Sequence, residues 1–260
     1  MPALDVRGKI AAAQIAFYVP VAVLTILLVF RYAFRRDAGW FFLLIFALVR
    51  ITGGALLVAA EMQPSNIDLF IAAYIIQFAG LALLMMSTIG FLGMAGQHTY
   101  SDVPRLSIMF RIIGLLALTA LAVSIAGGLL GTHVNPDAGS TGLILRRVGA
   151  GIFAGLYVAL TLIHFGTWTY RWHLKSYRRN LLWGISTALP FLGVRVAYSV
   201  LAAWSSSDLF GLSLSSNPTL ARFNPITGDW VPFLIMSLVM EYAVVLIYLL
   251  SSTWLSRRRL

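Results

Sequence analysis

Seven apolar runs, each about 20 residues long or longer, divide this 260-residue sequence. A helix needs about 20 predominantly apolar residues to cross a hydrocarbon core about 30 Å thick, and only a helix satisfies its own backbone over such a length within lipid. The runs are too long and too uniformly apolar to be strands of a membrane barrel. We therefore predict an all-α polytopic membrane protein, one domain of seven transmembrane helices near 10–30, 40–60, 69–96, 108–132, 148–170, 181–204 and 231–256.

Composition excludes several classes of protein. Hydrophobic residues make up 60% of the chain and charged residues 11%, whereas a soluble domain is about a quarter charged. The absence of cysteine excludes disulfides, thiolate metal sites and a cysteine nucleophile. The four histidines lack ligand spacing, and the sequence contains no zinc-protease, P-loop or dinucleotide-binding motif. We therefore expect no metal site and no cofactor.

Positive charge is distributed unevenly between the two sets of connections. Twelve Lys and Arg residues fall in connections 31–39, 97–111 and 171–180 and in the tail from 257, whereas five fall on the other side. Because cytoplasmic loops carry the excess, the N-terminus is predicted outside and the C-terminus in the cytosol. Most cations flank apolar runs, so the net charge of +10 indicates contact with membrane lipids and not with nucleic acid. The plasma membrane and the endoplasmic reticulum are both compatible with this pattern.

Two of the outer connections have a distinctive composition. The connection before the fifth span, His133 to Arg147, contains Asn-Pro-Asp and Gly, which is typical of turns, and Arg146 is assigned to it. The longest outer connection, 205–230, is rich in Ser, Asn, Pro and Gly. It is either a lid over the outer end of the bundle or a solvated surface loop.

Three charged residues lie inside the apolar runs instead of between them. Arg50 is central in 40–60, Arg195 lies deep in 181–204, and Glu241 lies in 231–256. An arginine at the centre of a membrane helix costs about 2.5 to 3.5 kcal/mol, and its guanidinium does not lose its proton. Ionisable residues inside a membrane mark functional sites by default, although an interhelical salt bridge that only fixes packing is the alternative.

Helical rise places the three charges at one depth. Each lies nine or ten residues from the outer end of its run, which is about 14 to 15 Å at 1.5 Å per residue. Gln77 is about 12 Å deep in the third run and is predicted to join this layer. Tyr198 lies one turn outward of Arg195 and can donate a hydrogen bond. We therefore predict that helices 2, 3, 6 and 7 converge on one polar site.

The predicted layer carries a surplus positive charge, because two arginines face one glutamate. A counter-anion has several possible sources: Glu61 drawn in from the outer end of the second run, a lipid head group, or the carboxylate or phosphate of a bound molecule. A water-filled cavity that solvates the guanidinium is a further possibility. The origin of the balancing charge is thus the central question that the sequence raises.

Three segments carry a resemblance to a known family. They are FALVRITGGALL at 46–57, LPFLGVRVAYSVL at 189–201 and MEYAVVLIYLL at 240–250. Nearly the whole chain resembles a family of fungal seven-transmembrane proteins that is catalogued as a domain of unknown function. The resemblance implies a fungal integral membrane protein, and it supplies neither an activity nor an assigned catalytic residue.

Three classes of function fit the charged layer, and the choice between enzyme and binding protein stays open. A sensor or carrier would bind a lipophilic or amphipathic, anionic small molecule through Arg50, Arg195, Glu241, Gln77 and Tyr198. A membrane-embedded terpene cyclase or isomerase of a fungal secondary-metabolite pathway would use Glu61 or Glu241 as general acid. Two guanidiniums beside Glu241 complicate that chemistry and make Glu61 the better proton donor. In a membrane scaffold, the charges would only fix packing. A sensor or carrier explains the arginines most simply.

Overall fold

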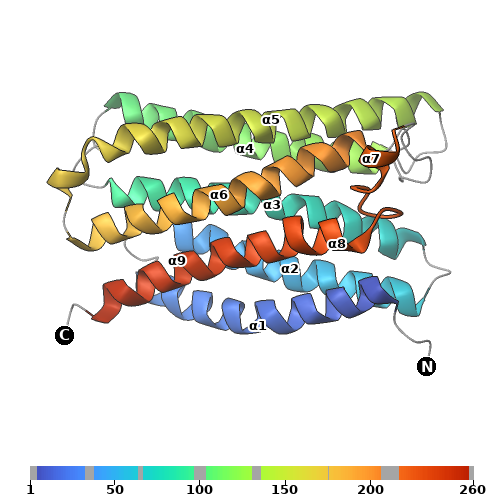
Figure 1. Cartoon of the computed structure of the whole chain (residues 1–260), viewed down its shortest axis with the longest axis horizontal. Coiled ribbons are helices and arrows are strands. Elements are labelled where there is room, and N and C mark those ends of the chain that lie inside the picture. The colour runs from blue at the N-terminus through green and yellow to red at the C-terminus, as the bar shows by residue number, and fades with distance from the viewer. Residues whose placement is uncertain are drawn as a thin grey trace.

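The computed structural model describes residues 5–32, 38–63, 67–96, 104–130, 136–174, 176–205 and 217–257. Within these ranges the chain is helical and contains no strand (Figure 1). Six long helices are continuous: α1 (Val6–Tyr32), α2 (Ala38–Met62), α3 (Ile67–Ala95), α4 (Pro104–Leu130), α5 (Pro136–Trp168) and α6 (Ser176–Trp204). The seventh consists of α8 (Trp230–Pro232), the π-helical segment η3 (Phe233–Val239) and α9 (Met240–Arg257), and the short helices are η2 (Arg171–His173) and α7 (Pro218–Ala221).

Seven of these helices are long and apolar enough to cross a membrane, as the sequence predicts. Their outward faces carry large apolar side chains, among them Leu27, Leu115, Leu162 and Phe165, each more than half exposed. Such faces would be costly in water and are expected against lipid tails. The chain therefore has the construction of a multi-pass, membrane-type helical protein.

The fifth helix begins earlier than predicted. We expected a turn at Asn-Pro-Asp and a span from 148, but α5 starts at Pro136. Proline is favoured at the first position of a helix, because its missing N–H has no partner there in any case. The assignment of Arg146 to a connection was therefore wrong, since this residue lies within α5.

Helix α3 occupies the centre of the bundle. It packs against α2, α4, α5 and α6, while α1 covers α2 and α9 packs against α6. In Figure 1, α4 and α5 form one side of the bundle and α1 lies at the opposite side. Helix α1 begins at one end of the bundle and α9 finishes at the other, and we call these the N-terminal end and the C-terminal end.

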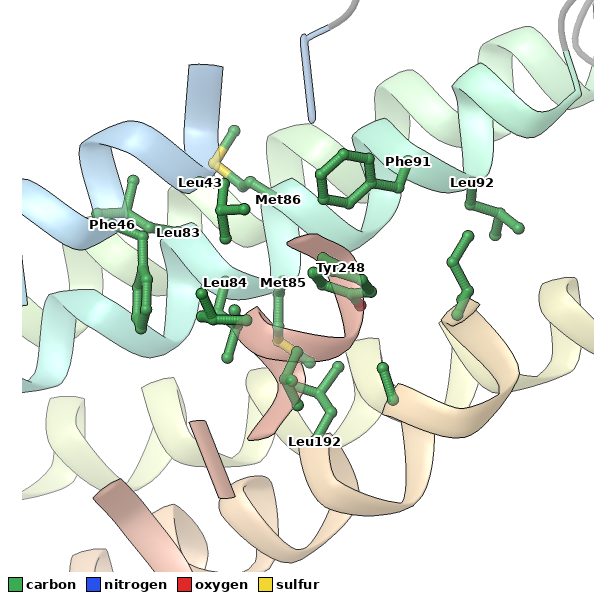
Figure 2. Packing of buried hydrophobic residues seen from close by; sticks show 14 of the residues in the cluster. Leu43, Phe46, Leu83, Leu84, Met85, Met86, Phe91, Leu92, Leu192 and Tyr248 are labelled. Carbon is green, nitrogen blue, oxygen red and sulfur yellow. The ribbon is translucent and has the colours of Figure 1, made fainter. Parts of the chain in front are cut away.

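The apolar core lies where α2, α3, α6 and α9 meet. Figure 2 shows Leu43 and Phe46 of α2, Met85 of α3 and Tyr248 of α9 within it, all fully buried. Towards the C-terminal end, α2 and α3 approach very closely, because a Cβ on Gly90 would lie 2.6 Å from the Cα of Gly39. Small residues let membrane helices pack at such distances and so hold the helices that carry the charged residues.

Candidate functional site

The three buried charges predicted to lie at one depth are in direct contact. Oε1 of Glu241 in α9 accepts a hydrogen bond from Nη2 of Arg50 in α2 and another from Nε of Arg195 in α6, the latter at 2.5 Å. Arg50 and Glu241 have no exposed surface, and Arg195 is 4% exposed. We call these three residues the ion cluster. It ties together helices that are far apart in the sequence.

The neighbours of Arg50 fix its guanidinium in place. A Cβ on Gly80 of α3 would lie 2.6 Å from Cζ of Arg50, so the guanidinium packs directly on the backbone of α3. On α2, Cζ of Arg50 lies 5.4 Å from the ring centroid of Phe46, in a cation–π arrangement. The backbone carbonyl of Arg50 accepts a hydrogen bond of 2.8 Å from Nε2 of Gln14 in α1. Helices α1, α2 and α3 therefore all position this one side chain.

A π-helical segment leads directly into Glu241. Segment η3 spans Phe233–Val239, and Met240 and Glu241 begin the α-helix that follows. π-helices are rare, and they often occur at functional sites. The wider turn changes the angular position of Glu241 relative to the residues that precede the segment. Here it directs the carboxylate between Arg50 and Arg195.

Several polar atoms near the ion cluster are buried without a hydrogen-bond partner among the described residues. They are Nε and Nη1 of Arg50, Oε2 of Glu241, Oγ of Ser237 and the hydroxyls of Tyr18 and Tyr198. Tyr198 lies beside the cluster, because its ring centroid is 5.8 Å from Cζ of Arg195. Tyr18 packs edge to face on Phe46, the same ring that Arg50 covers. The site therefore contains more unpaired donors than acceptors.

Two other predicted site residues lie away from the ion cluster. Oε2 of Glu61 accepts a hydrogen bond of 3.2 Å from the backbone N–H of Asp5 at the N-terminal end of the bundle. The possibility that Glu61 balances the arginines was therefore wrong. Gln77 lies one turn nearer the N-terminal end than Gly80 and lines a small cavity with Gly53 and Tyr74.

A larger cavity lies on the N-terminal side of the ion cluster. Its volume is about 400 Å³, and it is bounded by α3, α4, α5, α6 and the segment before α8. Its walls are mainly aromatic and aliphatic, with Phe70, Phe78 and Phe153 among the lining residues. Ser199 also lines it, and Arg195 lies four residues earlier on the same face of α6. The cavity and the ion cluster are therefore about one helical turn apart.

Arg146 is the charged residue of this cavity, and it was not among the site residues predicted from the sequence. Its Nη2 donates to the backbone carbonyl of Ala202 in α6 at 3.0 Å, and its Cζ lies 4.9 Å from the ring centroid of Phe78 in α3. Its Nε is buried and has no partner among the described residues. Arg146 could have been found if Pro136 and Asp137 had been interpreted as the start of a helix instead of a turn, because Arg146 then lies within that helix.

The segment 217–229 covers the cavity at the N-terminal end of the bundle. Pro225 and Ile226 line the cavity. The guanidinium of Arg7 in α1 donates to the carbonyls of Pro225 at 2.9 Å and Gly228 at 2.7 Å, and the hydroxyl of Tyr74 donates to Pro225 at 3.2 Å. This part of the connection 205–230 is therefore bonded to the bundle, while 206–216 lie outside the described residues.

One family sequence model covers nearly the whole chain. The family model described as a domain of unknown function, DUF7702, matches residues 4–258. The chain belongs to this family. No match is found among curated proteins or among solved structures. The family therefore supplies no activity for this DUF7702 member.

One further polar group in this DUF7702 protein lies nearer the C-terminal end. Nε2 of His164 in α5 is 2.7 Å from Oγ of Ser186 in α6 and accepts from Nε1 of Trp168 at 2.8 Å. His164 is the histidine buried among the described residues, and these residues include no group of three His, Asp or Glu side chains that could hold a metal. The cluster joins α5 to α6 and is separate from the cavity.

Proposed function

We propose that this membrane protein binds an amphipathic anion in the cavity beside Arg146, as a sensor or carrier. The observation that supports the proposal is the cavity itself, with a volume of about 400 Å³ and walls from four helices. Ligand pockets of proteins have volumes of about 300 to 1,000 Å³ and combine apolar walls with a few placed polar groups. This cavity has that composition.

The position of Arg146 favours an anionic head group. One nitrogen of its guanidinium is bonded to Ala202 and the side chain lies over Phe78, so its place is fixed. A carboxylate or phosphate in the cavity would neutralise the charge of this guanidinium, and charge-assisted hydrogen bonds are about twice as strong as neutral ones. The aromatic walls then suit an apolar tail.

The ion cluster lies about one helical turn from the cavity and would attract the same ligand electrostatically. Arg50 and Arg195 against Glu241 leave a charge of +1, which raises the electrostatic potential under the cavity. Tyr198 and Gln77 lie between the cluster and the N-terminal end and would complete the polar boundary. In this proposal Arg50 and Arg195 attract the ligand through their electrostatic potential and hold the surrounding helices in place. Arg146 contacts the ligand directly.

A cyclase is less well supported by these contacts. Oε1 of Glu241 is already bonded to Arg50 and Arg195 within the ion cluster. Glu61 bonds to Asp5 at the bundle end, and neither carboxylate lines the large cavity. General acid catalysis requires the acid within hydrogen-bonding reach of the reacting group. A binding function needs no such acid.

A binding measurement in nanodiscs tests the proposal. The probes are tritiated palmitate and its uncharged methyl ester, and the variants are Arg146→Gln and Ala150→Phe, which remove the charge and fill the cavity, respectively. Matched controls are Arg111→Gln on the exposed face of α4 and Gly151→Phe, where a side chain would meet open space. We expect saturable binding of palmitate, weakened at least tenfold by both cavity variants and by neither control.

Reconstituted vesicles then separate a carrier from a sensor. A carrier moves palmitate across the vesicle membrane at a rate that Ala150→Phe lowers, whereas a sensor binds without flux. With the N-terminus outside, as the distribution of Lys and Arg predicts, the cavity and its covering segment would face the exterior. Equal affinity for palmitate in wild type and in both cavity variants would refute the proposed function.

A further inference from the structure

A second cavity lies between α2, α3 and α4. Its lining includes Ala38 at the start of α2, Met94 near the end of α3 and Ser107 near the start of α4. These positions lie at the C-terminal end of the bundle, opposite the end that the segment 217–229 covers (Figure 1). The volume is about 340 Å³, and the cavity reaches the surface, because exposed Ala38 and Arg111 line it. We call it the C-terminal groove.

Two glycines leave space along the C-terminal groove. A Cβ on Gly93 of α3 or on Gly114 of α4 would meet no atom of the described residues within 4 Å, and both glycines line the groove. Gly90, three residues before Gly93, serves close packing instead, because its Cβ would lie 2.6 Å from the Cα of Gly39 in α2. Since protein interiors are close-packed, the space beside Gly93 and Gly114 points to an occupant from outside the chain.

The depth of the groove indicates the chemistry of this occupant. The fourth span begins at Leu106, so Gly114 lies about 12 Å inside it at 1.5 Å per residue. Met86 also lines the groove and lies about 13 to 14 Å from the end of the third span at Ala95. An irregular peptide segment at this depth would leave its backbone polar groups without hydrogen-bond partners. The acyl chain of a lipid has no such groups and is the occupant that this depth favours.

Arg111 adds a positive charge to the groove. It lies about 7 to 8 Å inside the fourth span, and no described residue pairs with it. A cation at such a depth is costly unless it finds an anion or extends towards the membrane surface. An arginine side chain is long enough to place its guanidinium near the head groups while its stem stays among apolar groups. There the guanidinium can form paired, charge-assisted hydrogen bonds with a phosphate.

We propose that the C-terminal groove binds one acyl chain of an anionic phospholipid, whose phosphate is held by Arg111. One molecule then fills the space along Gly93 and Gly114 and neutralises the cation beside them. The distribution of Lys and Arg predicts that this end of the bundle faces the cytosol, and the cytoplasmic leaflet is the one that contains anionic lipids. The site lies at the opposite end of the bundle from the cavity of Arg146 and goes beyond the binding function proposed for that cavity.

Native mass spectrometry of the full-length protein, released from detergent micelles, tests this site by counting retained lipids. The probes are dioleoyl phosphatidylserine and zwitterionic dioleoyl phosphatidylcholine. We expect wild type to retain phosphatidylserine about fivefold more strongly, since one arginine gives a preference of this size for anionic lipid. Arg111→Gln should abolish the preference. Gly114→Leu should weaken the retention of both lipids, because its side chain would occupy the groove.

Two matched controls should behave as wild type. Lys9→Gln removes an exposed cation of α1 at the other end of the bundle. Gly166→Leu makes the same exchange as Gly114→Leu on an exposed position of α5, where a Cβ also meets no described atom within 4 Å. Equal retention of phosphatidylserine and phosphatidylcholine by wild type would overturn the proposal. A loss of lipid in Gly166→Leu as large as that in Gly114→Leu would do the same.

Photolabelling of the wild-type protein gives a result that does not depend on the folding of variants. The probe is phosphatidylserine with a diazirine in its acyl chain, added to nanodiscs, and the labelled peptides are identified after irradiation. Labelling should concentrate in 86–94 and 107–114, above the level on the exposed face of α5 around Leu162 and Phe165. Equal labelling of α5 and the groove, or labelling that phosphatidylcholine with the same diazirine reproduces, would refute the site.

The phospholipid site and the palmitate site can fail independently. In the nanodiscs of the palmitate measurement, the bilayer itself supplies phospholipid to the C-terminal groove. Arg111→Gln therefore leaves palmitate binding at Arg146 unchanged, while it removes the preference for phosphatidylserine in the mass spectrometer. Ala150→Phe should have the opposite pattern, since Ala150 lines only the cavity of Arg146 among the two.

Discussion

Nε of Arg195 donates to Oε1 of Glu241 at 2.5 Å, although 46 residues separate the two positions. The same oxygen accepts from Arg50, 191 residues away from Glu241. One carboxylate oxygen therefore joins α2, α6 and α9. The other oxygen of Glu241 is buried and has no partner among the described residues. The strength of this junction depends on both its charge and its geometry.

Removing the glutamate should be more damaging than replacing the whole ion cluster. Glu241→Leu leaves two buried guanidiniums unpaired, and breaking a buried ion pair in this way costs about 3 to 5 kcal/mol. The triple variant Arg50→Met, Arg195→Met, Glu241→Leu has no buried charge left here, and apolar replacement of a buried network is often neutral or stabilising. Thermal unfolding midpoints in detergent should therefore rank the triple variant above Glu241→Leu.

The triple variant also separates a functional role from a purely structural one. If the cluster supports the ligand in the cavity, the triple variant should fold but bind palmitate more weakly than wild type. If the charges only fix packing, as in a scaffold, its palmitate affinity should equal that of wild type. A triple variant less stable than Glu241→Leu would contradict the charge argument altogether.

A methyl group on Gly80 should disturb the ion cluster directly. Its Cβ would lie 2.6 Å from Cζ and 2.8 Å from Nε of Arg50, and the guanidinium cannot move freely because it is bonded to Glu241. We expect Gly80→Ala to destabilise the protein by about 1 to 3 kcal/mol, as overpacking usually does. Gly93→Ala in the same helix is the control, since its Cβ would meet nothing within 4 Å.

Gly80→Ala should therefore lower stability, whereas Gly93→Ala should not. Gly93→Ala is expected to be neutral or to stabilise α3 by about 0.5 to 1 kcal/mol, because alanine is the better helix former. Denaturant midpoints measured in the same detergent compare the two. Equal stability of both variants would mean that Arg50 is not held against α3.

The ion cluster could be predicted from sequence because its signal is local. Each charge interrupts an apolar run, and the constant rise of a helix converts position into depth. Arg146 gave no such signal, since its place depends on where α5 begins, and Pro136 is compatible with a turn or a helix start. The bonds from Arg7 to the covering segment join residues 218 and 221 positions apart. The spacing of apolar residues does not reveal contacts between positions so far apart in the sequence. Composition likewise does not reveal the π-helical segment before Glu241.

Loss of the Arg7 side chain should release the covering segment. Arg7 donates two hydrogen bonds to the carbonyls of Pro225 and Gly228, and the Tyr74 hydroxyl donates one more to Pro225. Arg222 is exposed within the same segment and is a site for trypsin. We expect Arg7→Ala to increase the rate of tryptic cleavage after Arg222 several-fold, because local opening controls access of the protease. Lys9→Ala, at an exposed position of the same helix, should leave the rate unchanged.

Tyr74→Phe provides a graded version of this experiment. It removes only the bond of 3.2 Å from the tyrosine hydroxyl to Pro225, so its effect on cleavage should be smaller than that of Arg7→Ala. Cleavage at the wild-type rate in the Arg7 variant would show that other contacts hold the segment. In that case the segment would be a fixed wall of the cavity and not a releasable cover.

The hydroxyls of Thr88 and Tyr248 share a hydrogen bond, and removing one or the other should have unequal effects on stability. They lie 2.8 Å apart in the core, and Thr88 also donates to the carbonyl of Leu84 at 2.9 Å. Because a threonine hydroxyl has one hydrogen, Tyr248 must be the donor of the shared bond. Thr88→Val therefore leaves a buried tyrosine donor unpaired, at a cost of about 1 to 3 kcal/mol. Tyr248→Phe leaves Thr88 bonded to Leu84 and should cost less.

A double-mutant cycle checks this direction of donation. The double variant Thr88→Val, Tyr248→Phe removes donor and acceptor together, so its loss of stability should be smaller than the sum of the two single losses. Thr119→Val is the matched control, because Thr119 donates to Leu115 at 2.9 Å on the exposed face of α4 in the same way. If Tyr248→Phe proved more destabilising than Thr88→Val, the hydroxyl of Thr88 would donate to Tyr248 instead of to the carbonyl of Leu84.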